Sequence, residues 1–193
     1  MTEQPPSPRP GEVPPADLPP TAADALFERR VVLLQGFLGS GEATQVAAQL
    51  MALDALGDEG IRLQLHSDSG TLQGALTVMD TISALGVSVE TVCLGSAQGP
   101  ALGVLAVSRR RLAARHARLR FRPSDLAAEG TSAELTVALE WHLRQEARWV
   151  ELVAGATGQP AERVEVDLAQ ARYLELEEAI EYRLLDGILP SRP

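Results

Sequence analysis

The chain has 193 residues, of which 45% are hydrophobic and 4% aromatic, and its formal net charge is −9 at pH 7. This length and composition predict one domain with an aliphatic core, and the negative charge argues against general nucleic-acid binding, which needs net or clustered positive charge. All 17 basic residues are arginine, and neither lysine nor asparagine occurs. Their absence excludes Ser–Lys dyads, Schiff-base chemistry and Cys–His–Asn triads.

The single cysteine, Cys93, excludes an internal disulfide, and we interpret it as a small buried hydrophobe. No basic-then-apolar signal pattern opens the chain, and the longest apolar stretch, residues 92–107, is interrupted by polar residues and too short to span a bilayer. We therefore expect a cytoplasmic protein that uses no metal or other cofactor. No nucleic-acid or membrane partner is expected.

Residues 1–20 form a proline-rich segment that holds eight of the 13 prolines. Such a segment forms neither a helix nor a sheet ladder, so we expect a disordered or polyproline-II-like arm. It is interpreted either as an unstructured tail or as a docking arm or gate. Residues 21–193 are expected to form the domain.

From residue 21 onward, short apolar runs of strand length alternate with segments of helical spacing. The clearest helix begins at a capping box formed by Thr131 and Glu134 and runs for about six turns. The expected elements are, in chain order, a helix over 23–28, a strand over 31–36, a helix over 41–56, a strand over 61–65, a helix over 73–84, a strand over 87–94, a helix over 97–107, a strand over 118–122, the long helix from 131 through 153, a helix over 174–182 and a strand over 184–189. This alternation predicts an α/β fold with parallel pairing and right-handed crossovers.

Several short motifs along residues 30–189 together resemble one family, the proteolytic subunit of the ATP-dependent Clp protease (ClpP). The matching stretches are Ser67-Asp-Ser-Gly70 at the end of a strand, Asp80-Thr81, Leu94-Gly95, His116-Ala-Arg118-Leu, Thr157-Gly-Gln159-Pro, Glu178-Ala-Ile-Glu-Tyr182 and Leu185-Asp186-Gly-Ile188-Leu. The resemblance implies the ClpP/crotonase-like fold of stacked ββα units, with the long helix as a protruding handle. It also implies heptameric rings stacked in pairs around a closed chamber.

The resemblance further implies a serine nucleophile after a Gly-x-Ala-x segment, but that segment here reads Gly95-Ser-Ala-Gln-Gly99-Pro100. The nucleophile position is thus Gly99, which has no side chain. The next residue of the family donates a backbone N–H to the oxyanion hole, and Pro100 has no N–H. The second oxyanion position, Gly70, is retained.

The base and its orienting carboxylate are also replaced. With a two-residue deletion near 107–108, the histidine position corresponds to Arg122, which stays protonated and cannot serve as a base. The aspartate position, before an Arg-aromatic pair, is Ala171. Loss of a triad costs about 10⁶ in rate, and loss of an oxyanion donor about 10² more. We therefore expect a degenerate, ClpR-like pseudoprotease.

Relocated residues are the alternative to complete loss of activity. Ser67, Ser69 and Ser96 are the hydroxyls expected in the remnant of the substrate groove, and the histidines are His66, His116 and His142. Neighbouring residues of a strand point to opposite faces, so His66 is not expected to meet Ser67. We interpret these histidines as structural or surface residues, and the relocated base remains the alternative.

Seven of the 17 arginines lie between residues 109 and 122. They form either a solvated face that pairs with acidic groups of neighbouring subunits, or a surface that binds anions or acidic peptides. The leading hypothesis is a non-catalytic ring subunit that assembles with itself or with an active ClpP paralogue, in a structural or regulatory role. The resemblance also implies docking of an AAA+ chaperone, but the proline-rich segment departs from the axial loops that the family uses there, so this partner stays open. The alternatives are a residual serine hydrolase with relocated residues and a stand-alone scaffold.

Overall fold

The computed structural model describes residues 20–124, 126 and 128–190. The proline-rich arm expected over residues 1–20 lies outside the described residues except for its last position, where helix α1 (Pro20–Glu28) begins. Within the described part, seven strands form one sheet and seven helices accompany it. The expected α/β fold with parallel pairing is confirmed, because every strand pair but one is parallel.

The sheet has a continuous path of five strands in the order β1-β2-β3-β4-β7 and a short branch from β3. These five strands are β1 (Val31–Leu38), β2 (Ile61–Gly70), β3 (Val89–Gln98), β4 (Arg110–Ala113) and β7 (Gly187–Ile188). The branch holds β5 (Arg118–Arg120), parallel to the end of β3, and β6 (Tyr173–Leu174), antiparallel to β5. The branch therefore extends the sheet at the carboxyl end of β3.

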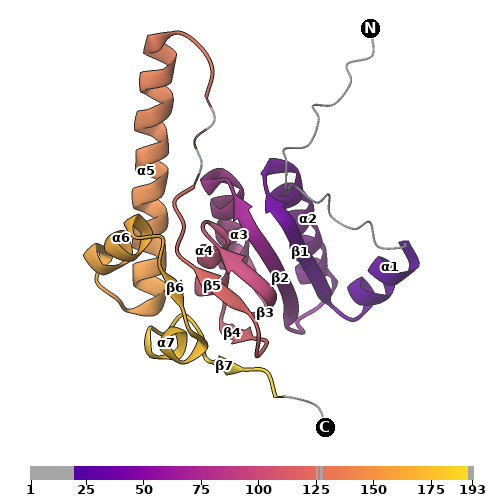
Figure 1. Cartoon of the computed structure of the whole chain (residues 1–193). Helices are drawn as coiled ribbons and strands as arrows, with labels where there is room; N and C mark the ends of the chain where they lie inside the picture. Colours follow the sequence, from indigo (N-terminus) through magenta and orange to yellow (C-terminus); the bar gives the residue numbers. More distant parts are fainter. Residues whose placement is uncertain (1–19, 125, 127, 191–193) are drawn as a thin grey trace, which may run out of the picture.

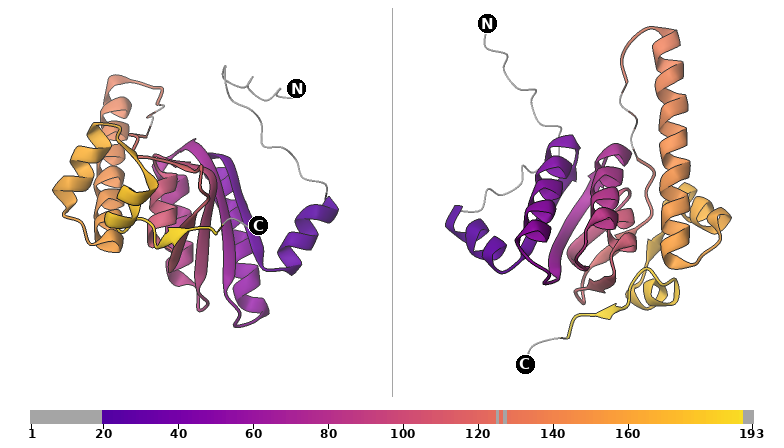
Figure 2. Two further views of the ribbon diagram at one scale, coloured as in Figure 1. Left: turned by 60° about the horizontal axis from the view of Figure 1, so that its bottom comes forward. Right: turned by 180° about the vertical axis from the view of Figure 1, so that it is seen from behind.

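Three helices cover one face of this sheet, and they are α2 (Ser40–Leu56), α3 (Leu72–Ala84) and α4 (Ala101–Val107) (Figure 2). The alternating burial of the side chains of β2 explains why the helices cover that face. Its odd residues, such as Leu63, Leu65 and Ser67, are fully buried, whereas Arg62 and His66 on the even positions are exposed. His66 and Ser67 thus project to opposite faces, as expected from the pleat.

Helix α5 (Ser132–Thr157) stands beside the sheet and projects well beyond the body of the molecule (Figure 1). The predicted capping box is confirmed, since the Glu134 carboxylate accepts the Thr131 N–H at 2.7 Å and the Thr131 hydroxyl accepts the Glu134 N–H. The helix ends at Gly158, whose φ of +70° suits glycine. Only its last turns are buried, through Trp149, Val150, Val153, Ala154 and Thr157.

The C-terminal part wraps the base of α5 with two short helices, α6 (Ala161–Ala169) and α7 (Leu176–Glu181). The sequence did not predict α6, β4 or β6. The helix expected over 97–107 was wrong in its first residues, because β3 continues to Gln98 to pair with β5 before α4 begins at Ala101. The strand expected over 184–189 shrinks to two residues, because the N–H groups of Leu184 and Leu185 bond back to Ala179 at the end of α7.

No helix within the described ranges combines the length and the apolar character that crossing a bilayer requires. The expected burial of Cys93 is confirmed, since its side chain is fully enclosed in the core. Burial raises the pKa of this thiol to about 12, which keeps it protonated and unreactive.

Candidate active-site region

The two positions that the resemblance assigns to the nucleophile and the base lie side by side. Gly99 follows β3, and its N–H donates to the Arg120 carbonyl at 3.0 Å. A Cβ placed on Gly99 would lie 3.0 Å from the carbonyl oxygen of Arg122 and 3.6 Å from its Cβ. The turn after β3 and the end of β5 therefore meet at this point.

The position assigned to the orienting carboxylate borders the same strand. The carbonyl of Ala171 accepts a hydrogen bond from Nε of Arg120 at 3.1 Å, and the next carbonyl, that of Arg172, accepts from the Phe121 N–H. Ala171 itself has a φ of +49°. The chain thus converges at Gly99, Arg122 and Ala171 without a hydroxyl, an imidazole or a carboxylate at any of these three positions.

Pro100 is built into the base of the projecting helix. Its carbonyl accepts the indole N–H of Trp149 at 3.1 Å, and the Trp149 ring packs edge-on against Phe121 with centroids 6.4 Å apart. Pro100 is the N-cap residue of α4, and its φ of −55° is one that the proline ring favours. The residue that cannot donate an oxyanion-hole N–H therefore has a structural role in joining α4 to α5.

Gly70, the other oxyanion position, has a packing reason to be glycine. A Cβ at Gly70 would lie 2.7 Å from Cβ of Leu38 and 2.8 Å from its carbonyl oxygen. Such a clash would push β1 away from β2, where these two residues pair. The retention of Gly70 follows from this close approach and is not evidence for an oxyanion hole.

A hydrogen-bonded polar cluster lies where β2 and β3 end. The Ser96 hydroxyl and the Gln98 amide both donate to Oδ1 of Asp68 at 2.6 Å, and the Ser96 N–H donates to Nδ1 of His66 at 3.2 Å. Oγ of Ser96 lies 3.5 Å from the same ring nitrogen. The structure thus brings a serine, a histidine and an aspartate together.

The hydrogen bonds of this cluster do not match those of an activated serine. A base must accept the proton of the serine, but here the hydroxyl points to the carboxylate, and Nδ1 of His66 accepts a backbone N–H. The Ser96 side chain is also fully buried. Attack by Ser96 would require the hydroxyl to leave Asp68 and a route for substrate to open.

Sequence reasoning missed this cluster because it compared His66 only with its chain neighbour. The pairing of β2 with β3 shifts register between Leu65 and Ser67, where β3 holds two extra residues and Ser67 pairs with Ala97. That shift carries Ser96 and Gln98 next to His66 and Asp68. The sequence indicated that β2 and β3 are adjacent parallel strands, and this could have suggested a contact between their ends. The register shift itself cannot be recognised in the sequence.

The other candidate residues have separate surroundings. The buried Ser67 hydroxyl donates to the carbonyl of Ser69 at 2.9 Å. His142, on α5, has Nε2 3.4 Å from the Ser124 hydroxyl, whereas His116 is exposed in the turn before β5. Within the described residues, neither Ser67 nor Ser69 makes a hydrogen bond to a histidine.

Arg122 occupies the assigned base position as a half-buried side chain. Its Nη1 lies 3.4 Å from the carbonyl oxygen of Asp68, so it reaches across from β5 to the end of β2. A guanidinium can stabilise negative charge here, but it cannot take a proton.

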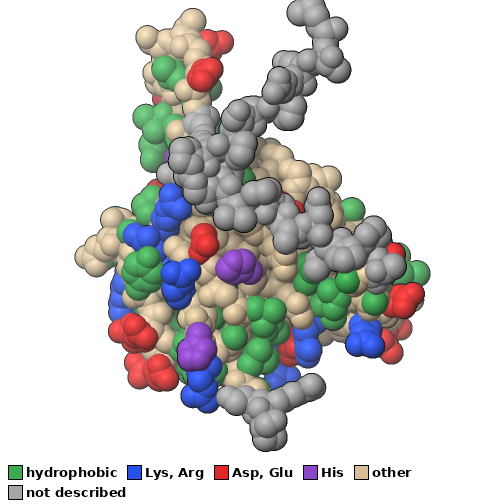
Figure 3. Space-filling model, turned by 45° about the vertical axis from the view of Figure 1, so that its right-hand side comes forward, with side chains coloured by type: hydrophobic (Ala, Val, Ile, Leu, Met, Phe, Trp, Pro, Cys, Tyr) green, Lys and Arg blue, Asp and Glu red, His purple; other side chains and the backbone are tan. Residues whose placement is uncertain are grey.

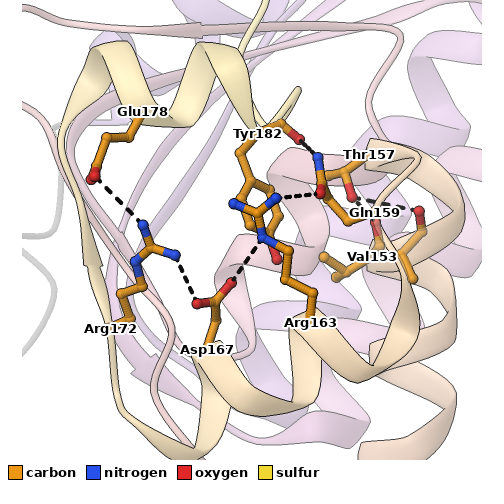
Figure 4. A network of polar contacts seen from close by, with 9 residues as sticks. Val153, Thr157, Gln159, Arg163, Asp167, Arg172, Glu178 and Tyr182 are labelled. Atoms are coloured by element: carbon orange, nitrogen blue, oxygen red, sulfur yellow. Dashed lines mark hydrogen bonds and ion pairs between the residues drawn. The ribbon is translucent and has the colours of Figure 1, made fainter.

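A polar network holds the segment that follows Ala171 (Figure 4). Asp167 is only 3% exposed, and its Oδ1 accepts Nη1 of Arg172 at 2.9 Å, while Nε of Arg163 lies 4.0 Å from Oδ2. The Arg163 guanidinium lies over the ring of Tyr182, and burial raises the pKa of Tyr182. The network holds Arg172 and with it the path of the chain next to Ala171.

Within the described residues, no group of three or more His, Cys, Asp or Glu side chains is arranged to hold a metal ion. The cluster offers only His66 and Asp68, and Oδ1 of Asp68 already accepts two hydrogen bonds.

Comparison with known proteins agrees with the motifs and the fold. The family model described as Clp protease matches residues 20–192. The chain is 30% identical over 171 residues to the ATP-dependent Clp protease proteolytic subunit 2 of Streptomyces coelicolor, an alignment that covers 86% of this chain and 78% of that protein.

Proposed function

The chain belongs to the Clp protease family, and from this premise we propose that it is a non-catalytic subunit of ring-shaped Clp-type particles. It assembles alone or with an active ClpP paralogue and has a structural or regulatory role. The observation that carries the proposal is the juxtaposition of Gly99 and Arg122. Where the family architecture would place an attacking oxygen and its base, this chain has a hydrogen atom and a permanent cation.

The backbone around Gly99 supports the same conclusion. Its φ of +55° lies in the left-handed region, and a side chain there would crowd the Arg122 carbonyl. Pro100 lacks the backbone N–H that the family uses as an oxyanion donor. Its carbonyl already accepts the indole N–H of Trp149. Reversion of a single residue would therefore not rebuild the machinery, because nucleophile, base and oxyanion donor fail together.

The surface of α5 supports assembly. Its projecting half exposes large apolar side chains that a monomer would leave in water: Leu135, Val137, Leu139, Trp141 and Leu143 are each 40% to 66% exposed. Leu135, Leu139 and Leu143 are spaced four residues apart and therefore form one exposed apolar stripe, whereas Val137 and Trp141 lie on the other side of the helix. Exposed apolar surface on a projecting helix is typical of a protein interface. We assign it to the contact between two stacked rings, which the resemblance places on the handle helix.

The assembly is tested by co-expressing the chain with an active ClpP paralogue from the same cell. Size-exclusion chromatography and native mass spectrometry are expected to show ring-sized particles, mixed or homomeric. The matched variants Leu139→Glu and Glu140→Gln, neighbours on α5, should respectively abolish ring pairing and leave it intact. A monomer in every preparation would refute the proposal.

The proposed consequences of a mixed ring are fewer active sites in the chamber and altered docking of an AAA+ chaperone. Peptide hydrolysis by the mixed particle should scale with the share of active subunits. Chaperone binding to homomeric and mixed rings, compared by pull-down, tests the second consequence.

A second candidate function is a residual serine hydrolase that uses Ser96, with His66 and Asp68. The observation that favours it is the 3.5 Å separation of the Ser96 hydroxyl from the imidazole. A fluorophosphonate probe discriminates between the two functions: labelling that disappears in Ser96→Ala but persists in Ser67→Ala supports the hydrolase. Absence of labelling in the wild type supports the non-catalytic subunit.

Truncation of the proline-rich arm distinguishes the ring subunit from a stand-alone scaffold whose arm binds a partner. Removing residues 1–19 should leave ring assembly unchanged if the handle helix carries it. A chain that is monomeric with and without the arm, and that loses its captured partners when the arm is removed, would favour the scaffold.

A further inference from the structure

One arginine beside the vacated site is arranged as a receptor for a carboxylate. Nε of Arg120 donates to the Ala171 carbonyl at 3.1 Å, and its guanidinium carbon lies 4.6 Å from the centroid of the Tyr173 ring. These two contacts hold the guanidinium in place over the ring. Within the part of the chain that the structure describes, its two terminal nitrogens have no protein acceptor.

A second cation lies on the same face of the sheet. Arg118 is two residues earlier on β5, so its side chain projects to the same side as that of Arg120. In the ladder with β3, Arg118 pairs with Ser96 and Arg120 with Gln98, while Arg120 pairs with Tyr173 on β6. Arg118 is exposed and has no side-chain partner among the described residues.

The local charge contrasts with that of the chain. Residues 109–122 hold seven arginines and no acidic residue, although the chain carries a net charge of −9. Arg110 and Arg111 are neutralised by Glu90 and Asp186, but Arg118 and Arg120 have no such partners. In the space-filling view, basic side chains gather on the body beside the projecting helix α5 (Figure 3).

The nearby carboxylate does not satisfy this cationic surface. Oδ1 of Asp68 accepts hydrogen bonds from Ser96 and Gln98, both at 2.6 Å. Nη1 of Arg122 donates to the backbone carbonyl of Asp68 at 3.4 Å. The face therefore presents one guanidinium held over an aromatic ring and a second, exposed guanidinium, next to Ser96 and Gln98, which donate to Oδ1 of Asp68.

We propose that Arg120 and Arg118 bind carboxylates of acidic peptide segments on the open face of the sheet. A planar guanidinium held on an aromatic ring accepts a carboxylate through two parallel hydrogen bonds with little further ordering. This binding goes beyond the proposed function, since it concerns what the chain holds rather than how it assembles. Nucleic acid draws its affinity from neutralising many phosphates along its backbone, whereas Arg118 and Arg120 offer two guanidinium groups, so nucleic acid is tested below as the competing occupant.

The test is fluorescence anisotropy of the full chain with a labelled peptide of alternating glutamate and glycine, at low and at high ionic strength. The glutamate peptide should bind, the matching glutamine peptide should not, and salt should weaken the binding. The double variant Arg118→Gln, Arg120→Gln should weaken binding about tenfold or more, from two lost charge pairs. The control variant Arg144→Gln, Arg148→Gln makes the same charge change on α5 and should leave the affinity unchanged.

Tyr173→Leu removes the ring beneath the guanidinium without changing charge, and it should weaken binding to an intermediate degree. Absence of peptide binding, an equal loss in both double variants, or a single-stranded RNA that binds as tightly as the peptide would each overturn the proposal. Size-exclusion chromatography of the same samples reports ring assembly, whereas anisotropy reports peptide binding. Failure of one proposal can therefore be told from failure of the other.

Discussion

Trp149 joins α5 to the turn that follows β3, because it is 1% exposed and donates its indole N–H to the Pro100 carbonyl. Replacing it by phenylalanine removes that donor and leaves a buried carbonyl unsatisfied, at a cost of about 1–3 kcal/mol. The lost ring also leaves space beside Phe121 and Gly103, against which the indole packs. From the lost hydrogen bond and the space left by the smaller ring together, we expect Trp149→Phe to destabilise the chain by about 2–4 kcal/mol.

Urea unfolding followed by far-UV circular dichroism measures this change without relying on tryptophan emission. Met51 on α2 supplies the control, since it is 55% exposed and Met51→Leu should change stability by less than about 0.5 kcal/mol. Equal losses in the two variants, or a loss below about 1 kcal/mol in Trp149→Phe, would refute the anchoring role that we assign to Pro100 and Trp149.

Two further predictions concern a glycine and a carboxylate. Gly99→Ala should lower the free energy of unfolding in urea by about 1–2 kcal/mol, because φ at Gly99 is +55° and the new Cβ would lie 3.0 Å from the Arg122 carbonyl oxygen. The control Gly155→Ala on α5, where a Cβ meets open space, should be neutral or stabilising. Equal effects of the two substitutions would contradict this reasoning. Hydrogen bonds from Arg111 lower the pKa of Asp186 in the folded chain, so its stabilisation is present above the unfolded pKa of about 4 and is lost as pH falls through the folded value. The stability difference between wild type and Asp186→Asn should therefore shrink below about pH 4, and a pH-independent difference would contradict this assignment.

Much of the fold was predictable because local chemistry and tertiary structure agree there. The apolar runs that start at Val31 and Ile61 became β1 and β2, and the capping box at Thr131 begins α5. These signals lie within one element and need no knowledge of its neighbours.

The missed elements depend on partners elsewhere in the chain. Strand β4 begins with Arg110 and Arg111, which give no apolar pattern, and it is held by ion pairs to Glu90 and Asp186. Strand β6 has two residues and exists only because β5 lies beside it. Such short strands are determined by the assembled sheet, so the sequence has no local mark of them.

The candidate site divides in the same way. The identities at Gly99, Arg122 and Ala171 are read from motifs, and the close approach of these positions follows from the fold. The contact of Ser96 with His66 depends on a register shift between β2 and β3, and the stacking of Arg120 on Tyr173 depends on the β5–β6 pairing. Side-chain patterns do not specify either one.

The most direct test of the central claim is hydrolysis of fluorogenic peptides by the purified particle of this chain alone, compared with its Ser96→Ala variant. We predict that both preparations release fluorophore at the rate of the buffer blank while size-exclusion shows assembled rings. Turnover by the wild-type particle that Ser96→Ala abolishes would contradict the account, because it would show that a hydroxyl outside the Gly99 position performs the cleavage.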